Sequence, residues 1–392
     1  MPGGRGVCRR EPGHGVPPSL KSSWNGVRTT IDPFVGTRGM IMAQTCHAAV
    51  FLGNDTYEVR EFAVPDPPPG GAVIKVEAVG LCGSDVAQFH GVELVPGASM
   101  FPVIPGHETV GRVVKLAADA TLGVSEGDRV AVDEILSIAP TFRVYGYTDM
   151  TGDGTLGLWG GYGEYMEIFA GTKLHRLTDN LPAEQLTLFE PLANAVNWTD
   201  IAGVKEGDSV VIQGPGHQGL AVLEAVLARK PGQVFVTGTS DDGMRLATAT
   251  QLGATHTIMV DKVDPVAFVA DHTGGTMADV VMDIASVVHT VPLCIDLVRW
   301  NGRVLLAGLK HFKPIPNFVT DMIVMKALTV CGGSGFTFAS MQRAVEMLES
   351  GEARSDLVVG EVFGLDQIDD AMALLSRALP GRDAVRVGLR HA

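Results

Sequence analysis

The first half of the chain shows short apolar runs that are separated by turn-forming residues. Apolar and β-branched residues dominate positions 48–52, 72–79, 112–116 and 129–132, with glycine, proline and acidic residues between them. Runs of this length and spacing predict strands rather than helices. Several short strands joined by turns predict a small, partly open β-barrel.

From about residue 209 onward, apolar strands alternate with helical segments. A helical pattern over 289–298 precedes Gly302, and other helical patterns separate the remaining strands. This alternation predicts an α/β fold with a doubly wound parallel sheet. The predicted strands are 209–213, 234–237, 256–260, 279–283, 303–307 and 328–330.

The last part of the chain is expected to return to the first domain. A helix over 340–348 ends at Gly351, and 384–389 is a final strand. Between them, Asp366 is a candidate N-cap with Asp369 in the first turn. Because 392 residues exceed the usual size of a single core, we expect two domains. The predicted division is an N-terminal extension at 1–43, a barrel domain at 44–197 that resumes at 335–392, and an α/β domain at 198–334.

Composition and charge narrow the range of partners. A formal net charge of −14 disfavours nucleic acid and anionic membranes, and no apolar run reaches the length of a membrane span. The five cysteines are scattered and odd in number, which favours a reducing compartment, the cytoplasm, over a disulfide framework. Residues 1–43 are basic and rich in glycine and proline. We expect a disordered extension there, or a true start at Met40 or Met42.

Thiol, imidazole and carboxylate side chains gather in two short loops bounded by glycine and proline. The first loop contains Cys82, Ser84 and Asp85, and the second contains His107 and Glu108. A thiolate, an imidazole and a carboxylate suit a tetrahedral zinc ion that keeps a fourth position open. Taken singly, each residue is more often a buried or hydrogen-bonded group, but their combination in such loops favours a metal site.

The sequence Gly-x-Cys-Gly-Ser-Asp at 80–85, followed by Pro-Gly-His-Glu-x-x-Gly at 105–111, resembles the zinc signature of the medium-chain alcohol and polyol dehydrogenases. The likeness extends from about Cys46 to His391. It implies a GroES-like barrel as the catalytic domain and a Rossmann domain for the cofactor. It also implies hydride transfer between an alcohol and NAD or NADP.

The resemblance assigns roles to the residues of these loops. Cys82 and His107 would be zinc ligands. Ser84 would pass the alcohol proton outward, and Asp85 would orient the ligand histidine. The family often has a histidine three residues after its serine to complete this proton path. An alanine stands there in this chain, and His90, three residues further on, is the candidate.

A second acidic motif, Phe-Glu-Pro-Leu-Ala at 189–193, resembles the Glu-Pro-Leu element beside the zinc of polyol dehydrogenases. By this resemblance Glu190 completes the metal set, directly or through water, and Glu108 is the neighbouring carboxylate that can exchange in. The alternative is that Glu190 caps a helix. No cysteine lies between Cys82 and Cys294, which excludes the four-cysteine structural zinc common in the family. We therefore expect one catalytic ion.

The turn Gly-Pro-Gly-His-Gln-Gly at 214–219 lies between a predicted strand and a predicted helix. G-x-G-x-x-G in this setting allows a tight turn and lets a pyrophosphate bind at the helix N-terminus. The candidate cofactor-binding residues in this turn are Gly214, Gly216, His217, Gln218 and Gly219.

Cofactor choice depends on the end of the next strand, where an acidic residue normally binds the ribose 2′-hydroxyl of NAD. A glycine stands there, and hydroxyl groups and an arginine that follow would admit the 2′-phosphate of NADP. Two aspartates at 241 and 242 would repel that phosphate, so we favour NAD. The candidate cofactor contacts in this region are Gly238, Thr239, Ser240 and Arg245.

The leading hypothesis is a zinc- and nicotinamide-dependent oxidoreductase of a small-molecule alcohol or carbonyl, with a secondary alcohol or polyol as substrate. A zinc-free quinone or enoyl reductase of the same fold would lack Cys82 and the His107–Glu108 pair, and a non-catalytic relative would be expected to lose metal ligands. In the resembling family the last strands of the cofactor sheet pair across a two-fold axis. The apolar strand 328–330 therefore predicts a homodimer or homotetramer.

Overall fold

The structure is a computed structural model that describes residues 44–92, 101–138, 141–316 and 318–391. The predicted N-terminal extension lies outside the described residues. Within them, none of the helices has the length and apolar character that crossing a membrane requires. The predicted boundaries between the barrel and the α/β domain stay predictions.

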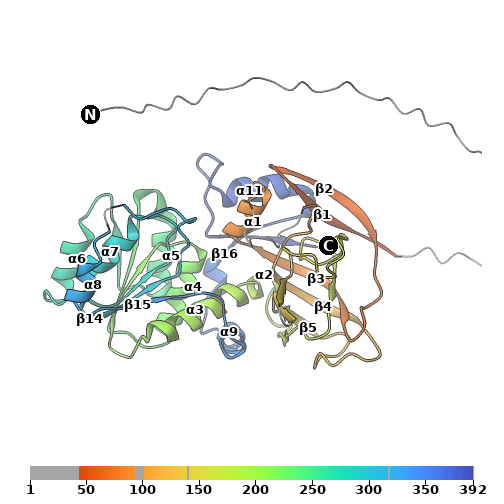
Figure 1. Cartoon of the computed structure of the whole chain (residues 1–392), viewed down its shortest axis with the longest axis horizontal. Helices are drawn as coiled ribbons and strands as arrows, with labels where there is room; N and C mark the ends of the chain where they lie inside the picture. The colour runs from red at the N-terminus through yellow and green to blue at the C-terminus, as the bar shows by residue number, and fades with distance from the viewer. Residues whose placement is uncertain (1–43, 93–100, 139–140, 317, 392) are drawn as a thin grey trace, which may run out of the picture. The chain divides into compact units, whose positions relative to one another are not determined.

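Short strands dominate the first part of the described chain, as expected (Figure 1). Two short helices accompany them, α1 (Gly83–Phe89) after the third strand and α2 (Ala183–Leu186) after the ninth. The strands are β1 (Thr45–Gly53), β2 (Thr56–Ala63), β3 (Ala72–Leu81), β4 (Glu108–Leu116), β5 (Arg129–Val132), β6 (Ile135–Ile138), β7 (Thr141–Val144), β8 (Tyr165–Ile168) and β9 (Leu174–Arg176).

A seven-stranded sheet places the thiol loop and the histidine loop side by side. Its order is β16-β17-β3-β4-β5-β9, with β8 also paired to β3. Strands β3 and β4 are antiparallel, and their register sets Gly80 opposite Glu108. Because β3 ends at Leu81 and β4 begins at Glu108, the two candidate metal loops emerge from the same end of this strand pair.

The α/β part contains a six-stranded parallel sheet with the order β12-β11-β10-β13-β14-β15. Its strands are β10 (Ser209–Gln213), β11 (Gln233–Gly238), β12 (His256–Met259), β13 (Ala278–Asp283), β14 (Val298–Leu306) and β15 (Thr329–Gly332). Its helical segments are α3 (Phe189–Ala202), α4 (His217–Leu227), η1 (Ser240–Asp242), α5 (Gly243–Leu252), α6 (Pro265–His272), α7 (Thr290–Leu297) and α8 (Asp321–Met325). The predicted doubly wound parallel sheet is confirmed.

Successive side chains of a strand point to opposite faces of the sheet, so alternate residues pack in two different hydrophobic cores. Val210 and Ile212 pack in one cluster with residues of α3 and α4. Val211 lies between them and packs in the other cluster with Cys294 and Ile295 of α7. Both faces are therefore covered by helices, which explains the continuous apolar sequence of β10.

The chain then returns to the barrel sheet through α9 (Phe338–Ser350), α10 (Ser355–Val358), β16 (Val359–Phe363), η2 (Leu365–Gln367), α11 (Ile368–Leu375) and β17 (Arg386–Arg390). Strand β17 is antiparallel to β3. Helix α9 ends at Gly351 with φ +74°, as expected. The expectation that Asp366 is an N-cap was wrong. Asp366 lies inside η2, whose N-cap is Gly364, two residues earlier. The backbone N–H of Gly364 donates to the Gln367 side chain at 3.1 Å.

Candidate functional site

Cys82 lies at the N-cap of α1, directly after β3. Its backbone N–H donates to Asp85 Oδ2 at 2.7 Å, and Asp85 is fully buried. The other carboxylate oxygen of Asp85 lies 3.8 Å from His107 Nδ1. Asp85 thus fixes the backbone of the thiol loop and stands beside the imidazole.

The glycines of the two loops are required by close contacts. A Cβ at Gly80 would lie 2.2 Å from Glu108 Oε2 and 1.8 Å from Arg386 Nη2. Gly106 has φ +98°, which favours glycine, and a Cβ there would lie 2.6 Å from the Tyr162 ring. Substitution at either position would displace the strand pair that positions Cys82 and His107.

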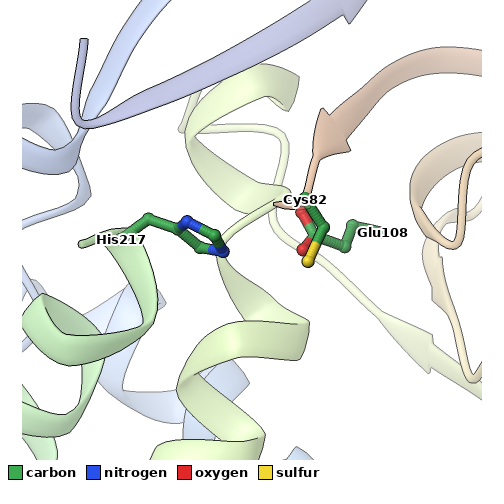
Figure 2. Close-up of side chains that lie close together, drawn as sticks. All are labelled: Cys82, Glu108 and His217. Atoms are coloured by element: carbon green, nitrogen blue, oxygen red, sulfur yellow. The ribbon is translucent and has the colours of Figure 1, made fainter. Parts of the chain in front are cut away.

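Three potential metal donors converge in the described structure. Cys82, Glu108 and His217 each offer one ligand atom, and these atoms lie within 4.8 Å of one another (Figure 2). His107 joins them, since its Nε2 lies 4.0 Å from Glu108 Oε1. His217, which sequence reasoning placed with the cofactor contacts only, therefore lies beside the metal donors.

The thiol in this cluster has an altered acidity. Burial alone would raise the pKa of Cys82, but hydrogen bonding to the imidazoles of His107 and His217 lowers it well below its usual value. The thiolate is the form that binds zinc. The environment of Cys82 therefore favours the chemical form that a metal site needs.

Carboxylates crowd the same region. Burial, and next the charge of Glu108, raise the pKa of Glu190 to about 8. Burial and then Glu190 raise the pKa of Glu134, a 7% exposed residue that sequence reasoning missed. Bound cations reverse such repulsion. A bound divalent cation would favour the ionised form of these carboxyl groups, so their concentration around a thiolate fits a metal site.

One buried oxygen strengthens this fit. Among the described residues, Glu108 Oε1 has no hydrogen-bond partner although it is buried. Buried polar atoms normally have a hydrogen-bond partner. A buried carboxylate oxygen without one is explained by a bound ion. A thiolate, imidazoles and an unpaired carboxylate oxygen form the donor set that zinc prefers. The residues present fit a zinc ion.

Glu190 lies in the first turn of α3 but does not cap it, because no side-chain hydrogen bond caps this helix. Its Oε1 instead accepts a hydrogen bond from Asn194 Nδ2 at 2.5 Å. The side chain is 8% exposed. This arrangement leaves the second oxygen of Glu190 available, while Glu108 is the carboxylate that lies with Cys82.

Glu108 forms a buried ion pair that was not predicted. Its Oε2 pairs with Arg386 Nη2 of β17, and the two side chains are 0% and 1% exposed. The same nitrogen donates to the backbone carbonyl of Thr187 at 2.8 Å. Arg386 follows Glu108 by 278 residues, and no sequence pattern signals such a pairing.

Tyr147 is a second residue that sequence reasoning missed. Its hydroxyl donates to Ser84 Oγ at 2.8 Å and lies 3.0 Å from His107 Nδ1. Because the tyrosine proton is used toward Ser84, the contact to His107 requires an Nδ1–H donor. That tautomer leaves the lone pair of His107 Nε2 free for a metal.

His90, the candidate for the proton path, lies elsewhere. Its imidazole pairs with Asp55, and the His90 side chain is 52% exposed. The structure does not bring His90 together with Ser84, whose hydroxyl contacts Tyr147. A tyrosine in the glycine-flanked segment after β7 carries no spacing signal that would identify it in advance.

The G-x-G-x-x-G turn has the geometry of a phosphate-binding loop. Gly214 has φ +100°, and a Cβ at Gly219 would lie 1.9 Å from the Gly214 carbonyl oxygen. Gly216 is the N-cap of α4, so His217 is the first residue of that helix. Gln218 Nε2 donates to the Pro191 carbonyl at 2.8 Å and connects the turn to the Glu-Pro-Leu motif.

The candidate phosphate-binding residues after β11 are hydrogen-bonded or paired to carboxylates. Gly238 ends the strand as expected. Thr239 donates through its backbone N–H and hydroxyl to Asp242, at 2.8 and 2.9 Å. Ser240 donates in the same way to Asp261, at 2.7 and 2.5 Å, and Arg245 pairs with Asp383 at 2.8 Å. The candidate phosphate contacts are therefore not free in this structure.

Comparison with known proteins gives relatives over most of the chain. A Mycobacterium tuberculosis protein named "Probable alcohol dehydrogenase adh" is 35% identical over 338 residues, which cover 81% of this chain and 91% of that protein. An erythritol/L-threitol dehydrogenase of Mycolicibacterium smegmatis is 29% identical over 377 residues, covering 89% and 97%. A zinc-binding dehydrogenase of Sinorhizobium meliloti, solved with bound NADP, is similar in fold. Its TM-score is 0.78 at 24% identity, with 89% of this chain and 100% of that chain covered.

Two family models match the two parts of the fold described above. The alcohol dehydrogenase GroES-like domain matches residues 68–179, and the zinc-binding dehydrogenase domain matches residues 219–350. The first match contains Cys82, His107 and Glu108. Together with the Mycobacterium tuberculosis relative, these matches show that the chain belongs to the zinc-binding, medium-chain alcohol dehydrogenase family.

Proposed function

We propose that this protein binds one zinc ion through Cys82, His107 and a carboxylate, and oxidises a secondary alcohol or polyol with a nicotinamide dinucleotide. The observation that carries this proposal is the meeting of Cys82 and Glu108 with His217, the fourth residue of the phosphate-binding turn. A metal site and a dinucleotide turn on adjoining elements suit hydride transfer between an alcohol and a nicotinamide. When bound, zinc supplies Lewis-acid polarisation of the substrate oxygen.

Ser84 carries the alcohol proton in this proposal, and Tyr147 orients Ser84. Ser84 Oγ accepts a hydrogen bond from Tyr147, so it retains a lone pair for the substrate proton and its own O–H for donation outward. Ser84 is partly exposed, which gives that proton a route to solvent. Tyr147 also holds His107 in the tautomer that a metal ligand needs.

The charges around β11 support NAD over NADP. Hydrogen bonds from Ser240 lower the pKa of Asp261 to about 2, so this carboxylate stays ionised at neutral pH. Asp242 is likewise engaged with Thr239 and with Arg377. A 2′-phosphate would have to displace these carboxylates and then approach their charges, whereas a 2′-hydroxyl can donate to one of them.

The edge of the six-stranded sheet supports a homo-oligomer. Strand β15 is the terminal strand, and Val330 within it is 37% exposed. Val324 and Met325 of the nearby helix α8 are 79% and 60% exposed. An apolar edge strand is normally paired, covered or protected by charged residues. A second copy of this chain would supply a pairing strand.

We also propose the cytoplasm as location. Cys46, Cys82, Cys294 and Cys331 are all free thiols in the described structure, which is consistent with a reducing compartment.

Cys82→Ser should abolish turnover and leave nucleotide binding intact. A serine hydroxyl is a poor zinc ligand, so the metal and its polarising effect are lost, and kcat/KM should fall at least about 1,000-fold. Zinc content, alcohol-dependent growth of nicotinamide absorbance, and NADH binding by fluorescence test this. Cys331→Ser, which changes a thiol outside the cluster, is the matched control. Full activity of zinc-free Cys82→Ser would refute the proposal.

Tyr147→Phe should reduce kcat/KM by roughly 10- to 100-fold, as is typical when the partner of a metal-bound histidine is lost. Ser84→Ala should add little in the double variant, because both changes interrupt one proton path. The pH profile of kcat is the second readout, since a purely structural loss would not shift it. Tyr145→Phe removes a buried hydroxyl that contacts Thr172 instead and should leave that profile unchanged. Equal behaviour of the two tyrosine variants would argue against the role of Tyr147.

NAD should be preferred over NADP, as judged by the ratio of the two kcat/KM values. Asp261→Asn removes one negative charge near the end of β11, so it should raise the relative kcat/KM for NADP several-fold. Asp264→Asn, which changes the N-cap of α6, serves as a charge control. A wild type that prefers NADP, with a ratio that Asp261→Asn does not change, would contradict this expectation.

Light scattering at micromolar concentration should give at least twice the 41.4 kDa mass of one chain. Val324→Asp should shift the protein toward the monomer, because a buried charge in an apolar interface is costly. Val287→Asp, at an exposed apolar residue in the segment after β13, should not. A monomeric wild type would rule out the oligomer.

A further inference from the structure

His217 belongs to two sites at once. It is the first residue of α4 and the fourth position of the G-x-G-x-x-G turn, where a pyrophosphate would bind. Its imidazole does not point away from the metal donors. It reaches across to Cys82 and Glu108, and one ring nitrogen lies within 4.8 Å of both ligand atoms (Figure 2).

The number of protein ligands at the proposed zinc site determines whether His217 can bind the metal. A catalytic zinc ion takes three protein ligands and keeps the fourth position open, whereas a closed site has four protein ligands. Cys82, His107 and one carboxylate supply three. We propose that in the cofactor-free protein His217 is the fourth metal ligand, and that binding of the nicotinamide dinucleotide displaces it. This inference rests on the zinc site proposed above.

The cofactor and the His217 ring compete for the same space. Hydride transfer requires the nicotinamide carbon to approach the reacting carbon to about 3–3.5 Å, so the nicotinamide must lie between the turn and the metal donors. The imidazole of His217 already spans that gap. A dinucleotide that enters the turn therefore has to turn this ring away, and the fourth metal position opens to the alcohol.

The turn allows this exchange without moving the helix. Gly216 before His217 has extended backbone geometry, with φ −68° and ψ 175°, and the next side chain is anchored by the hydrogen bond from Gln218 to the Pro191 carbonyl. His217 is partly exposed, so rotation of its side chain alone carries the ring to solvent. The arrangement imposes an order, in which the cofactor binds before the alcohol.

Metal affinity in the absence of cofactor tests the first half of the proposal. Zinc affinity is measured by competition with a chromophoric chelator for wild type, His217→Ala and His217→Gln. Both variants should bind zinc roughly 10- to 100-fold more weakly than wild type. His272→Ala changes an exposed histidine of α6 and should bind zinc as wild type does. Equal affinity for zinc in wild type and both His217 variants would overturn the proposal.

Linkage between metal and cofactor tests the second half. If NADH displaces His217, zinc must weaken NADH binding to wild type by the same factor by which NADH weakens zinc binding. In His217→Ala that coupling should disappear, which fluorescence titration of NADH against zinc-loaded and zinc-free protein would show. Identical coupling in wild type and His217→Ala would overturn the displacement.

Cobalt spectroscopy gives a readout that does not depend on activity. In the Co²⁺ form, free imidazole should bind to His217→Ala and restore the wild-type absorption spectrum, and should leave cofactor-free wild type unchanged. Identical spectra of the two proteins before imidazole is added would overturn the proposal. Cys82→Ser distinguishes failure of the His217 proposal from failure of the zinc-site proposal. Loss of metal binding in Cys82→Ser together with unchanged binding in His217→Ala refutes only the role of His217, whereas unchanged binding in both refutes the zinc site itself.

Discussion

The buried pair of Glu108 and Arg386 is the constraint on which the arrangement of the donor loops depends. Removing two charges from water costs several kcal/mol for each ion, and only good geometry with further hydrogen bonds offsets this cost. Arg386 meets that condition in part: its Nη2 contacts Glu108 and the Thr187 carbonyl, whereas Nε and Nη1 have no partner among the described residues. Gly80 is needed in the same place, since any side chain would overlap the guanidinium. One interaction thereby fixes the register of β3, β4 and β17.

This constraint also explains the orientation of the metal donors. One oxygen of Glu108 is held by the guanidinium, so the other faces His107 and Cys82. Asp85 fixes the backbone of Cys82, and Tyr147 holds the Nδ1 side of His107. Each donor therefore has a second contact that leaves its ligand atom directed at the same point, which is how metal sites are generally supported.

Local patterns in the sequence were sufficient for the fold class and for the loops that carry the chemistry, but not for strands β2 and β6 to β9. The alternation of apolar residues predicted β10 to β15, and the glycines at 214 and 219 predicted the turn before α4. Contacts between distant segments were not predictable. Arg386 and Tyr147 reach the site only because β17 and the segment after β7 fold back on β3 and α1, and neither residue lies in a spacing pattern. The position of His217 relative to Cys82 likewise depends on how two separate segments pack, although its place in the turn was predicted.

The route of the chain has a consequence for how the protein is made. The strands of the six-stranded sheet come from one continuous stretch, so that sheet can fold as soon as it leaves the ribosome. The metal loops emerge early, but the guanidinium that holds Glu108 follows 278 residues later. At 5–20 residues per second, this interval lasts roughly 15–60 s. During that time Glu108 has no guanidinium partner, and strand β17 has not yet joined the sheet. A zinc ion would therefore meet an incomplete site. Loading of the metal is therefore expected to follow completion of translation, after the last strand has joined the sheet.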